Sequence, residues 1–232
     1  MNKTIKISQA DAIAETQSFF VKVYGWMSLA LIITGLVAIW TASNADIMSV
    51  LIESRWVFFG LLILELVLVA GLVGWIAKMS SQTAALIFVL YSMLNGFTLS
   101  IIFLIYTTDS IASTFFITAG TFAVMSLYGY FTKSDLTKLG NILLMGLTGL
   151  IIASVVNLFY QDETLYWITT YAGILIFTGL IAYDTQKIKN LNIIGNEGTD
   201  EDKKEAIIGA LTLYLDFINL FLKLLRIFGR KK

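Results

Sequence analysis

The stretch GLIAYDTQKIKNLNIIGNEGTDEDKKEAIIGALTLYLDFINL, from Gly179 to Leu220, joins the end of one apolar segment to most of the next. Each segment carries one aspartate, Asp184 in the first and Asp216 in the second. A carboxylate inside a membrane helix costs roughly 2.5–3.5 kcal/mol even on the lenient insertion scale. A chain that keeps two of them in apolar segments is therefore expected to use them, and ion or proton handling is the first function to consider.

The polar residues between the two segments predict a helical hairpin. Residues 195–198 include two glycines and are expected to end the first helix, and Thr199 with the acidic residues 200–202 is expected to cap and charge the second. Each aspartate lies 16 residues from Asp200. Antiparallel helices folded around that position would bring the two carboxyl groups to the same height.

Two carboxyl groups within hydrogen-bonding reach cannot both ionise cheaply in a poorly hydrated site, and they tend to share one proton. We therefore predict that Asp184 and Asp216 form a pH sensor, which after deprotonation would repel itself open or recruit a cation. Two other interpretations stay open. Asp184 could pair with Lys187 at the helix end, and Asp216 could be a structural acid bonded to a facing backbone.

The composition is that of a polytopic membrane protein. Of 232 residues, 57% are hydrophobic and 14% are charged, and the mean hydropathy is +0.80. The net charge of zero gives no basic face for nucleic acid. The absence of cysteine and histidine excludes disulfides, thiolate and Ser-His catalysis, and His- or Cys-based metal or haem sites. Hard oxygen ligands remain, which favour calcium or magnesium, and we expect no tightly bound cofactor.

Seven uncharged or nearly uncharged segments are long enough to span a bilayer. They predict one seven-helix transmembrane domain over 23–232, preceded by a polar N-terminal tail over 1–22, without a cleavable signal and in a full-length chain. The segments are 23–42, 56–77, 83–106, 111–131, 140–160, 165–187 and 205–227.

The basic residues predict the orientation. Lysines gather before the first segment and after the second, fourth and sixth, whereas the opposite loops hold only Arg55, so the N-terminus is expected to be cytoplasmic. A full seventh span would carry basic residues to the far side. Either the last helix is covered by protein and spans against its charge, which we favour, or it is broken and returns its tail. These residues are Lys223, Arg226, Arg230, Lys231 and Lys232.

Further polar residues could assist the aspartates. Glu65 lies midway along the second segment, and Asn95 and Asn157 offer amide oxygens from the third and fifth, so together with Asp184 and Asp216 they could form a weak calcium site. Glu65 could instead make a hydrogen bond between helices, and both asparagines could join helices. Small residues that could let helices approach are Gly71, Gly74, Gly146, Gly149 and Ala153.

Five separated motifs in order give the chain a family resemblance. It resembles the bacterial branch of the Bax inhibitor-1 family, also called the transmembrane Bax-inhibitor-motif family, over nearly all of the chain after the tail. The motifs are LNGFTLSIIFLIYT (Leu94 to Thr107), YGYFTKSDLTKLG (Tyr128 to Gly140), MGLTGLIIASVVNLF (Met145 to Phe159), AYDTQKIK (Ala182 to Lys189) and LYLDFINLFLKLLR (Leu213 to Arg226).

The resemblance implies seven helices with the last at the centre of two three-helix layers, and a pH-dependent calcium leak. The family's sensor aspartates map by motif onto Asp184 and Asp216, and its calcium-linked glutamate maps onto Glu65. The family's latching arginine has no counterpart in the second segment, where Lys78 is the possible stand-in. Ile101 replaces a proline that is common in relatives.

We therefore predict a non-enzymatic calcium leak channel, with possible proton coupling, in a bacterial inner membrane, whose partners are the bilayer, calcium and protons. Some bacterial relatives bind membrane AAA proteases, so a non-catalytic modulator of such a protease is the alternative, with the tail as its contact. An intramembrane aspartyl protease is a remote alternative. Tyr183-Asp184 imitates its first motif, but the residues before Asp216 lack the glycines of its second.

Overall fold

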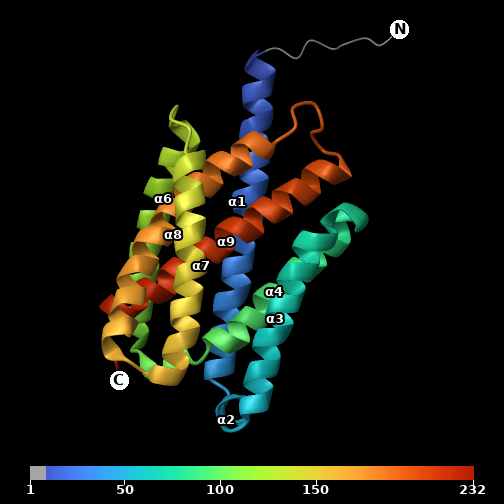
Figure 1. Cartoon of the computed structure of the whole chain (residues 1–232). Coiled ribbons are helices and arrows are strands. Elements are labelled where there is room, and N and C mark those ends of the chain that lie inside the picture. Colours follow the sequence, from blue (N-terminus) through green and yellow to red (C-terminus); the bar gives the residue numbers. More distant parts are fainter. Residues whose placement is uncertain (1–8) are drawn as a thin grey trace. The chain divides into compact units, whose positions relative to one another are not determined.

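The computed structural model describes residues 9–232, and this part of the chain is built from helices without a β-strand. Seven helices are long and apolar enough to cross a membrane, which confirms the predicted all-α fold. They are α1 (Gln9–Ala42), α3 (Arg55–Trp75), α4 (Ser81–Leu99), α6 (Thr108–Phe131), α7 (Thr137–Tyr160), α8 (Glu163–Leu191) and α9 (Asp200–Phe228) (Figure 1). Three short helices are α2 (Ala45–Glu53), η1 (Ile76–Lys78) and α5 (Ile102–Ile105). The arrangement in two layers around a central helix stays a prediction.

The first helix begins earlier than the hydropathy predicts, at Gln9 rather than at residue 23. Residues 9–22 contain no glycine or proline and are rich in alanine, glutamate and glutamine, which are strong helix formers. The helix therefore continues through the polar part of the predicted tail. Residues 1–8 of that tail, which include Lys3 and Lys6, lie outside the described residues.

The third predicted segment, 83–106, is interrupted. Helix α4 ends at Leu99, and α5 starts at Ile102. At the break, the Ser100 hydroxyl donates to the Phe97 carbonyl at 2.6 Å, and the Ser100 N–H is shared between Gly96 and Phe97. A serine that bonds back to the preceding turn bends or ends a helix, so the break forms without a proline at residue 101.

Contacts divide the chain into two compact units that do not follow chain order. Unit 1 comprises the chain up to Ile101 and residues 188–211, and unit 2 comprises residues 102–187 and 212–232. Helices α8 and α9 each contribute to both units, and a single domain over 23–232 stays a prediction.

In unit 1, α4 packs along α1 and α3. Gly96 marks the close approach of α4 to α1, because a Cβ atom there would lie 2.8 Å from the Thr34 carbonyl oxygen and 2.7 Å from the Val37 Cβ. The Thr34 hydroxyl also donates to the Ser92 carbonyl at 2.9 Å. The backbones of the two helices are thus held in contact where only glycine fits.

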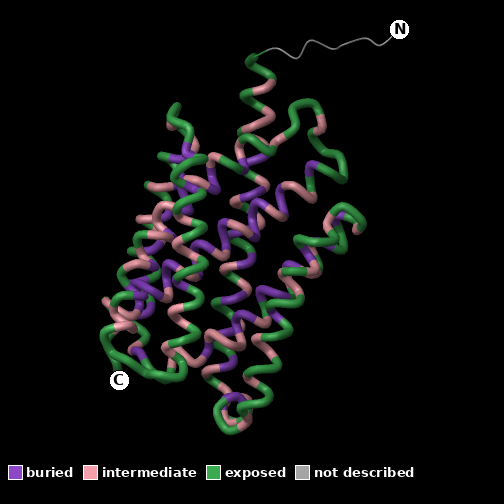
Figure 2. The backbone as a smooth tube through the Cα atoms, viewed as in Figure 1, coloured by how far each residue is buried: buried purple, intermediate pink, exposed green. Residues whose placement is uncertain are grey.

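Helix α9 is unbroken and covered by protein. In its most apolar stretch 72% of the residues are buried, against 6% for α7, and Figure 2 shows buried positions recurring along it. In unit 2 its Phe217 ring packs on Phe115 and Phe122 of α6, with centroids 5.3 and 5.7 Å apart. The last helix is thus continuous and covered by protein, whereas the side of the membrane on which it ends stays a prediction. One basic residue at the C-terminal end contacts protein, because Lys232 Nζ donates to the Phe103 carbonyl at 2.6 Å.

The glycines at which helices approach each other closely are mostly not the glycines that the sequence predicts. A Cβ atom on Gly74 or Gly149 would meet nothing within 4 Å, and one on Gly71 would meet only Trp75 of the same helix. Gly146 faces Ile176 at 3.2 Å and is the one predicted glycine that contacts another helix. The tight approaches in the described chain lie elsewhere, at Gly96, Gly129, Gly140, Gly173, Gly179 and Gly229.

Candidate functional site

The turn that leads from α8 into α9 forms as the sequence predicts. Gly195 and Gly198 have φ angles of 96° and 81°, in the left-handed region that favours glycine. Thr199 then caps α9, because its hydroxyl oxygen accepts the N–H of Asp202 at 3.2 Å. The prediction that glycines end α8 and that Thr199 caps α9 is therefore confirmed.

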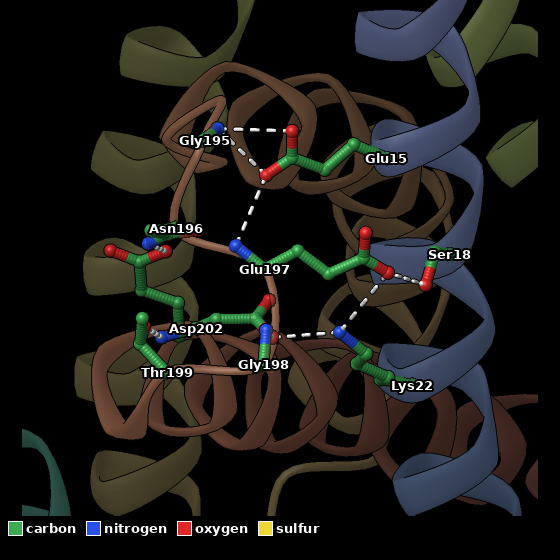
Figure 3. Close-up of polar contacts among 10 residues, drawn as sticks. Glu15, Ser18, Lys22, Gly195, Asn196, Glu197, Gly198, Thr199 and Asp202 are labelled. Carbon is green, nitrogen blue, oxygen red and sulfur yellow. Dashed lines mark hydrogen bonds and ion pairs between the residues drawn. The ribbon is translucent and has the colours of Figure 1, made fainter.

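Helix α1 holds this turn within unit 1. The Glu15 carboxylate accepts the N–H of Gly195 at 2.8 and 2.9 Å and the N–H of Glu197 at 3.2 Å (Figure 3). The Lys22 ammonium group donates to the buried carboxylate of Asp202 at 2.7 Å. The hairpin is thus fixed by side chains from a segment that the sequence analysis assigned to a polar tail.

Asp184 of α8 and Asp216 of α9 lie together in unit 2. Their side chains are hydrogen-bonded to each other, and the residues are only 7% and 5% exposed. The second carboxyl oxygen of Asp216, Oδ2, is buried and makes no hydrogen bond within residues 9–232. Two carboxyl groups can share a hydrogen bond only if one of them carries a proton, and the joint titration of this pair stays a prediction.

Glycines of two neighbouring helices fix the residues just before Asp184. A Cβ atom on Gly129 of α6 would collide with the carbonyl oxygen of Ala182, and one on Gly140 of α7 would collide with the ring of Tyr183. Helix α6 therefore approaches the backbone of α8 directly at Gly129, and α7 packs against the Tyr183 ring at Gly140. The packing of Ala182 and Tyr183 against these glycines therefore helps to fix the height of Asp184.

Polar bonds fix the residues that follow Asp184. The hydroxyls of Thr185 and Ser126 are 2.9 Å apart and buried. The Gln186 amide oxygen accepts the Leu136 N–H at 2.9 Å, and its amide nitrogen donates to the Ser134 carbonyl at 2.8 Å. These supports could not be predicted from local pattern, although most of them lie in or next to the motifs YGYFTKSDLTKLG and AYDTQKIK.

Lys187 is the base nearest to Asp184 on the same helix. It is exposed and its ammonium group lies 5.9 Å from the centre of the Tyr183 ring. Within residues 9–232, no ion pair joins Lys187 to Asp184. Asp184 therefore pairs with Asp216, and Lys187 acts on it only as a nearby charge.

Glu65 forms hydrogen bonds between two helices, as the alternative interpretation of this residue predicts. It is 8% exposed, and its two oxygens accept from the Thr98 hydroxyl at 2.9 Å and the Asn95 amide at 3.3 Å. These bonds join α3 to α4 in unit 1. Within residues 9–232 no three acidic side chains are grouped so that they could hold a metal ion, and a calcium site shared by Glu65 and the aspartates stays a prediction.

Two other predicted site residues lie at helix ends. The amide oxygen of Asn157 accepts the N–H of Asp162 at 2.9 Å and closes the turn after α7. Asn157 follows Gly140 by 17 residues, which is about 25 Å along the helix, so the structure does not bring it to the aspartates. Lys78 is exposed at the end of η1 and makes no ion pair in the part of the chain that the structure describes.

Comparison with known proteins agrees with the motifs. Residues 16–232 match the family described as "Inhibitor of apoptosis-promoting Bax1". The chain is 50% identical over 220 residues to the inner membrane protein YbhL of Escherichia coli strain K12, covering 94% of each chain. It is 45% identical over 214 residues to an uncharacterized protein of Borreliella burgdorferi, covering 92% of each. An uncharacterized protein of Rickettsia prowazekii is 46% identical over 217 residues, covering 92% of this chain and 90% of that protein. The chain is therefore an integral membrane protein that belongs to the Bax inhibitor-1 family.

Proposed function

We propose that this protein is a calcium leak channel of the bacterial inner membrane and that the Asp184–Asp216 pair controls its opening. The observation that carries the proposal is the contact between two buried carboxyl groups, which can share a hydrogen bond only when one of them is protonated. Removing the last proton places two negative charges in contact where little water can screen them. The pair then separates or accepts a cation.

Calcium suits this pair because it takes hard carboxylate oxygens in flexible geometry. Asp216 Oδ2, which bonds to none of the described residues, supplies one such oxygen without any rearrangement. Protonation returns the pair to its hydrogen-bonded form, so acid favours the closed population and alkali the open one. A calcium ion that occupies the pair competes with its proton, which couples the leak to pH.

The test is calcium entry into dye-loaded vesicles containing the whole chain, measured between about pH 5 and pH 8. We expect entry to rise with pH in the intact protein and to lose this dependence in Asp184→Asn and in Asp216→Asn. Asp46→Asn is the matched control, because Asp46 is an exposed acid in the first turn of α2. An unchanged pH profile in both pair variants would refute the sensor, and no entry at any pH would refute the channel.

Modulation of a membrane-bound AAA protease is a second proposal, because the polar part of α1 presents an exposed apolar side chain. Ile13 is exposed, while Glu15 and Lys22 are engaged by the α8–α9 turn. Ile13→Ser should then weaken protease association and spare calcium entry. Association that survives this change would remove α1 from the contact.

We propose no catalytic role for the aspartates. A proton-sharing pair also resembles the dyad of aspartyl proteases, but the glycines of the protease motif are missing before Asp216. Cleavage of a transmembrane peptide by the reconstituted protein, lost in Asp216→Asn, would replace the channel proposal with a protease.

A further inference from the structure

A second charged cluster lies in unit 2, toward the C-terminal end of α9. Lys223 is only 8% exposed and follows Asp216 by seven residues, about 10 Å along the helix. Arg226 lies one turn further. Its guanidinium carbon is 4.9 Å from the centre of the Tyr166 ring, and its Nη1 donates to the Thr170 hydroxyl at 3.5 Å.

The position of Lys223 depends on a glycine in α8. A Cβ atom on Gly173 would lie 2.8 Å from Cε and 3.1 Å from Cδ of Lys223. The lysine stem therefore lies flat on the α8 backbone, and any other residue at 173 would push it away. Together with the Tyr166 ring beneath Arg226, this packing places both cations on the face of α9 that meets α8.

Neither cation has an acidic partner in the described chain. The ion pairs formed by Lys22 and Lys204 lie in unit 1 and include neither Lys223 nor Arg226, and Asp216 contacts Asp184. Asp162, at the start of α8, accepts the Leu165 N–H at 2.6 Å instead. Like charges three residues apart on a helix repel each other, and a buried cation is costly unless it is paired. An anion that contacts both would relieve both costs.

The depth of the cluster indicates which anion. Helices α8 and α9 have 29 residues each, or about 43 Å, whereas the hydrocarbon core is about 30 Å thick. A centred helix thus extends about 6–7 Å beyond the core at each end. Lys223 lies five residues before the end of α9 at Phe228, and Tyr166 lies three residues after the start of α8. In this centred arrangement, the offsets of about 7 and 4 Å place Lys223 at the edge of the hydrocarbon core and Tyr166 in the headgroup region, so the long basic side chains can reach the lipid phosphates.

We propose that Lys223 and Arg226 bind the phosphate of an anionic phospholipid headgroup, with Thr170 and Tyr166 positioning Arg226. The lysine supplies a compact charge, and the guanidinium retains donors beyond the one that it gives to Thr170. Basic sites between membrane helices recognise anionic lipids in this way. A zwitterionic lipid binds less well, because its own ammonium group opposes the two cations.

The test is lipid retention by the whole chain in bilayer discs of mixed phosphatidylglycerol and phosphatidylcholine, read by mass spectrometry of the released complex. We expect the intact protein to retain phosphatidylglycerol, and Lys223→Gln and Arg226→Gln to retain it roughly tenfold less, the effect of one lost charge-assisted bond. Lys231→Gln, an exposed base near the same end, should behave like the intact protein. Unchanged retention in both cluster variants, or an equal loss in Lys231→Gln, would overturn the proposal.

Two further measurements distinguish a lipid phosphate from soluble phosphate, and loss of binding from loss of folding. In discs of phosphatidylcholine alone, inorganic phosphate should not raise the unfolding temperature; a rise equal to that given by phosphatidylglycerol would assign the site to soluble phosphate instead. Lys223→Arg, which keeps the charge, should retain the lipid better than Lys223→Gln does. Loss of the lipid in Lys223→Arg, with normal unfolding, would overturn the lysine's role. None of these measurements uses calcium entry, so they are independent of the proposed channel function.

Discussion

Gly140 of α7 lies against the ring of Tyr183, the residue that immediately precedes Asp184, so closely that a side chain on residue 140 would overlap the ring. This contact places the backbone of α7 against the residue next to Asp184. The position of Asp184 is therefore set by a residue that has no chemistry of its own.

The first prediction follows from this contact. Gly140→Ala should destabilise the protein by about 1–3 kcal/mol, the usual cost of overpacking, and should disturb the pH dependence of calcium entry, because Tyr183 must move and carry Asp184 with it. The matched control is Gly149→Ala in the same helix, where a Cβ atom meets nothing within 4 Å. That change should be neutral or slightly stabilising in thermal unfolding. Equal unfolding temperatures for the two variants would contradict the contact.

The second prediction concerns the buried ion pair between Lys22 and Asp202, which is 2.7 Å long. Asp202 also accepts the Gly198 N–H at 2.9 Å, so Asp202→Ala should cost about 2–3 kcal/mol, reduced from a fully buried pair because Lys22 is partly exposed. Limited proteolysis within residues 192–199 should become faster.

The control for that pair is Lys204→Gln. Lys204 forms an ion pair of 3.2 Å with Asp200 one helical turn away, and the Asp200 side chain is 46% exposed; helix pairs at this spacing are worth about 0.3–0.5 kcal/mol. Proteolysis of the turn should be unchanged in this variant. If both variants are cleaved at the rate of the intact protein, the α1 contacts do not hold the turn.

The third prediction is a pH effect at the turn between α6 and α7. The hydroxyl and N–H of Thr137 hold the pKa of Asp135 below its ordinary value of 3.8. A lowered pKa stabilises the folded turn above the ordinary value, and this contribution is lost as the pH falls through the folded value. Asp135→Ala should therefore reduce hydrogen-exchange protection of the first turn of α7 at neutral pH.

At a pH below the folded value, Asp135→Ala and the intact protein should show the same protection. Asp46→Ala, which removes an exposed acid from the first turn of α2, should leave α7 unchanged at every pH. A protection difference at α7 that persists in strong acid would show that the carboxylate charge is not its cause.

The sequence predicts the membrane helices well, because hydropathy indicates which segments are buried in the bilayer. It also predicts the α8–α9 turn well, because glycine and threonine have local conformational preferences. It predicts the start of α1 badly, because residues 9–22 are too polar to lie in the bilayer and yet form part of the helix. It also misses the glycines that matter. Gly140 and Gly149 look alike in the chain, and only the tertiary contact with Tyr183 distinguishes them.

Part of the candidate site could likewise be predicted from the sequence, and part could not. The equal spacing of Asp184 and Asp216 around Asp200 is visible in the chain and leads to their contact. The partners of Glu65 are not visible, because Thr98 and Asn95 become its neighbours only when α3 and α4 pack together. The role of a side chain therefore cannot be predicted from local sequence when its partners lie on another helix.

The last prediction separates the two interpretations of Glu65. Both of its carboxylate oxygens already accept hydrogen bonds from α4, so we expect a structural role. Glu65→Gln keeps an acceptor for Thr98 and should change stability by less than about 1 kcal/mol. Glu65→Leu leaves the Asn95 amide and the Thr98 hydroxyl without that partner and should cost about 1–3 kcal/mol. Calcium entry and its pH profile should be unchanged in Glu65→Gln. If entry falls in this variant while thermal unfolding does not, the charge of Glu65 acts on the ion, and the glutamate belongs with the aspartates as a calcium ligand.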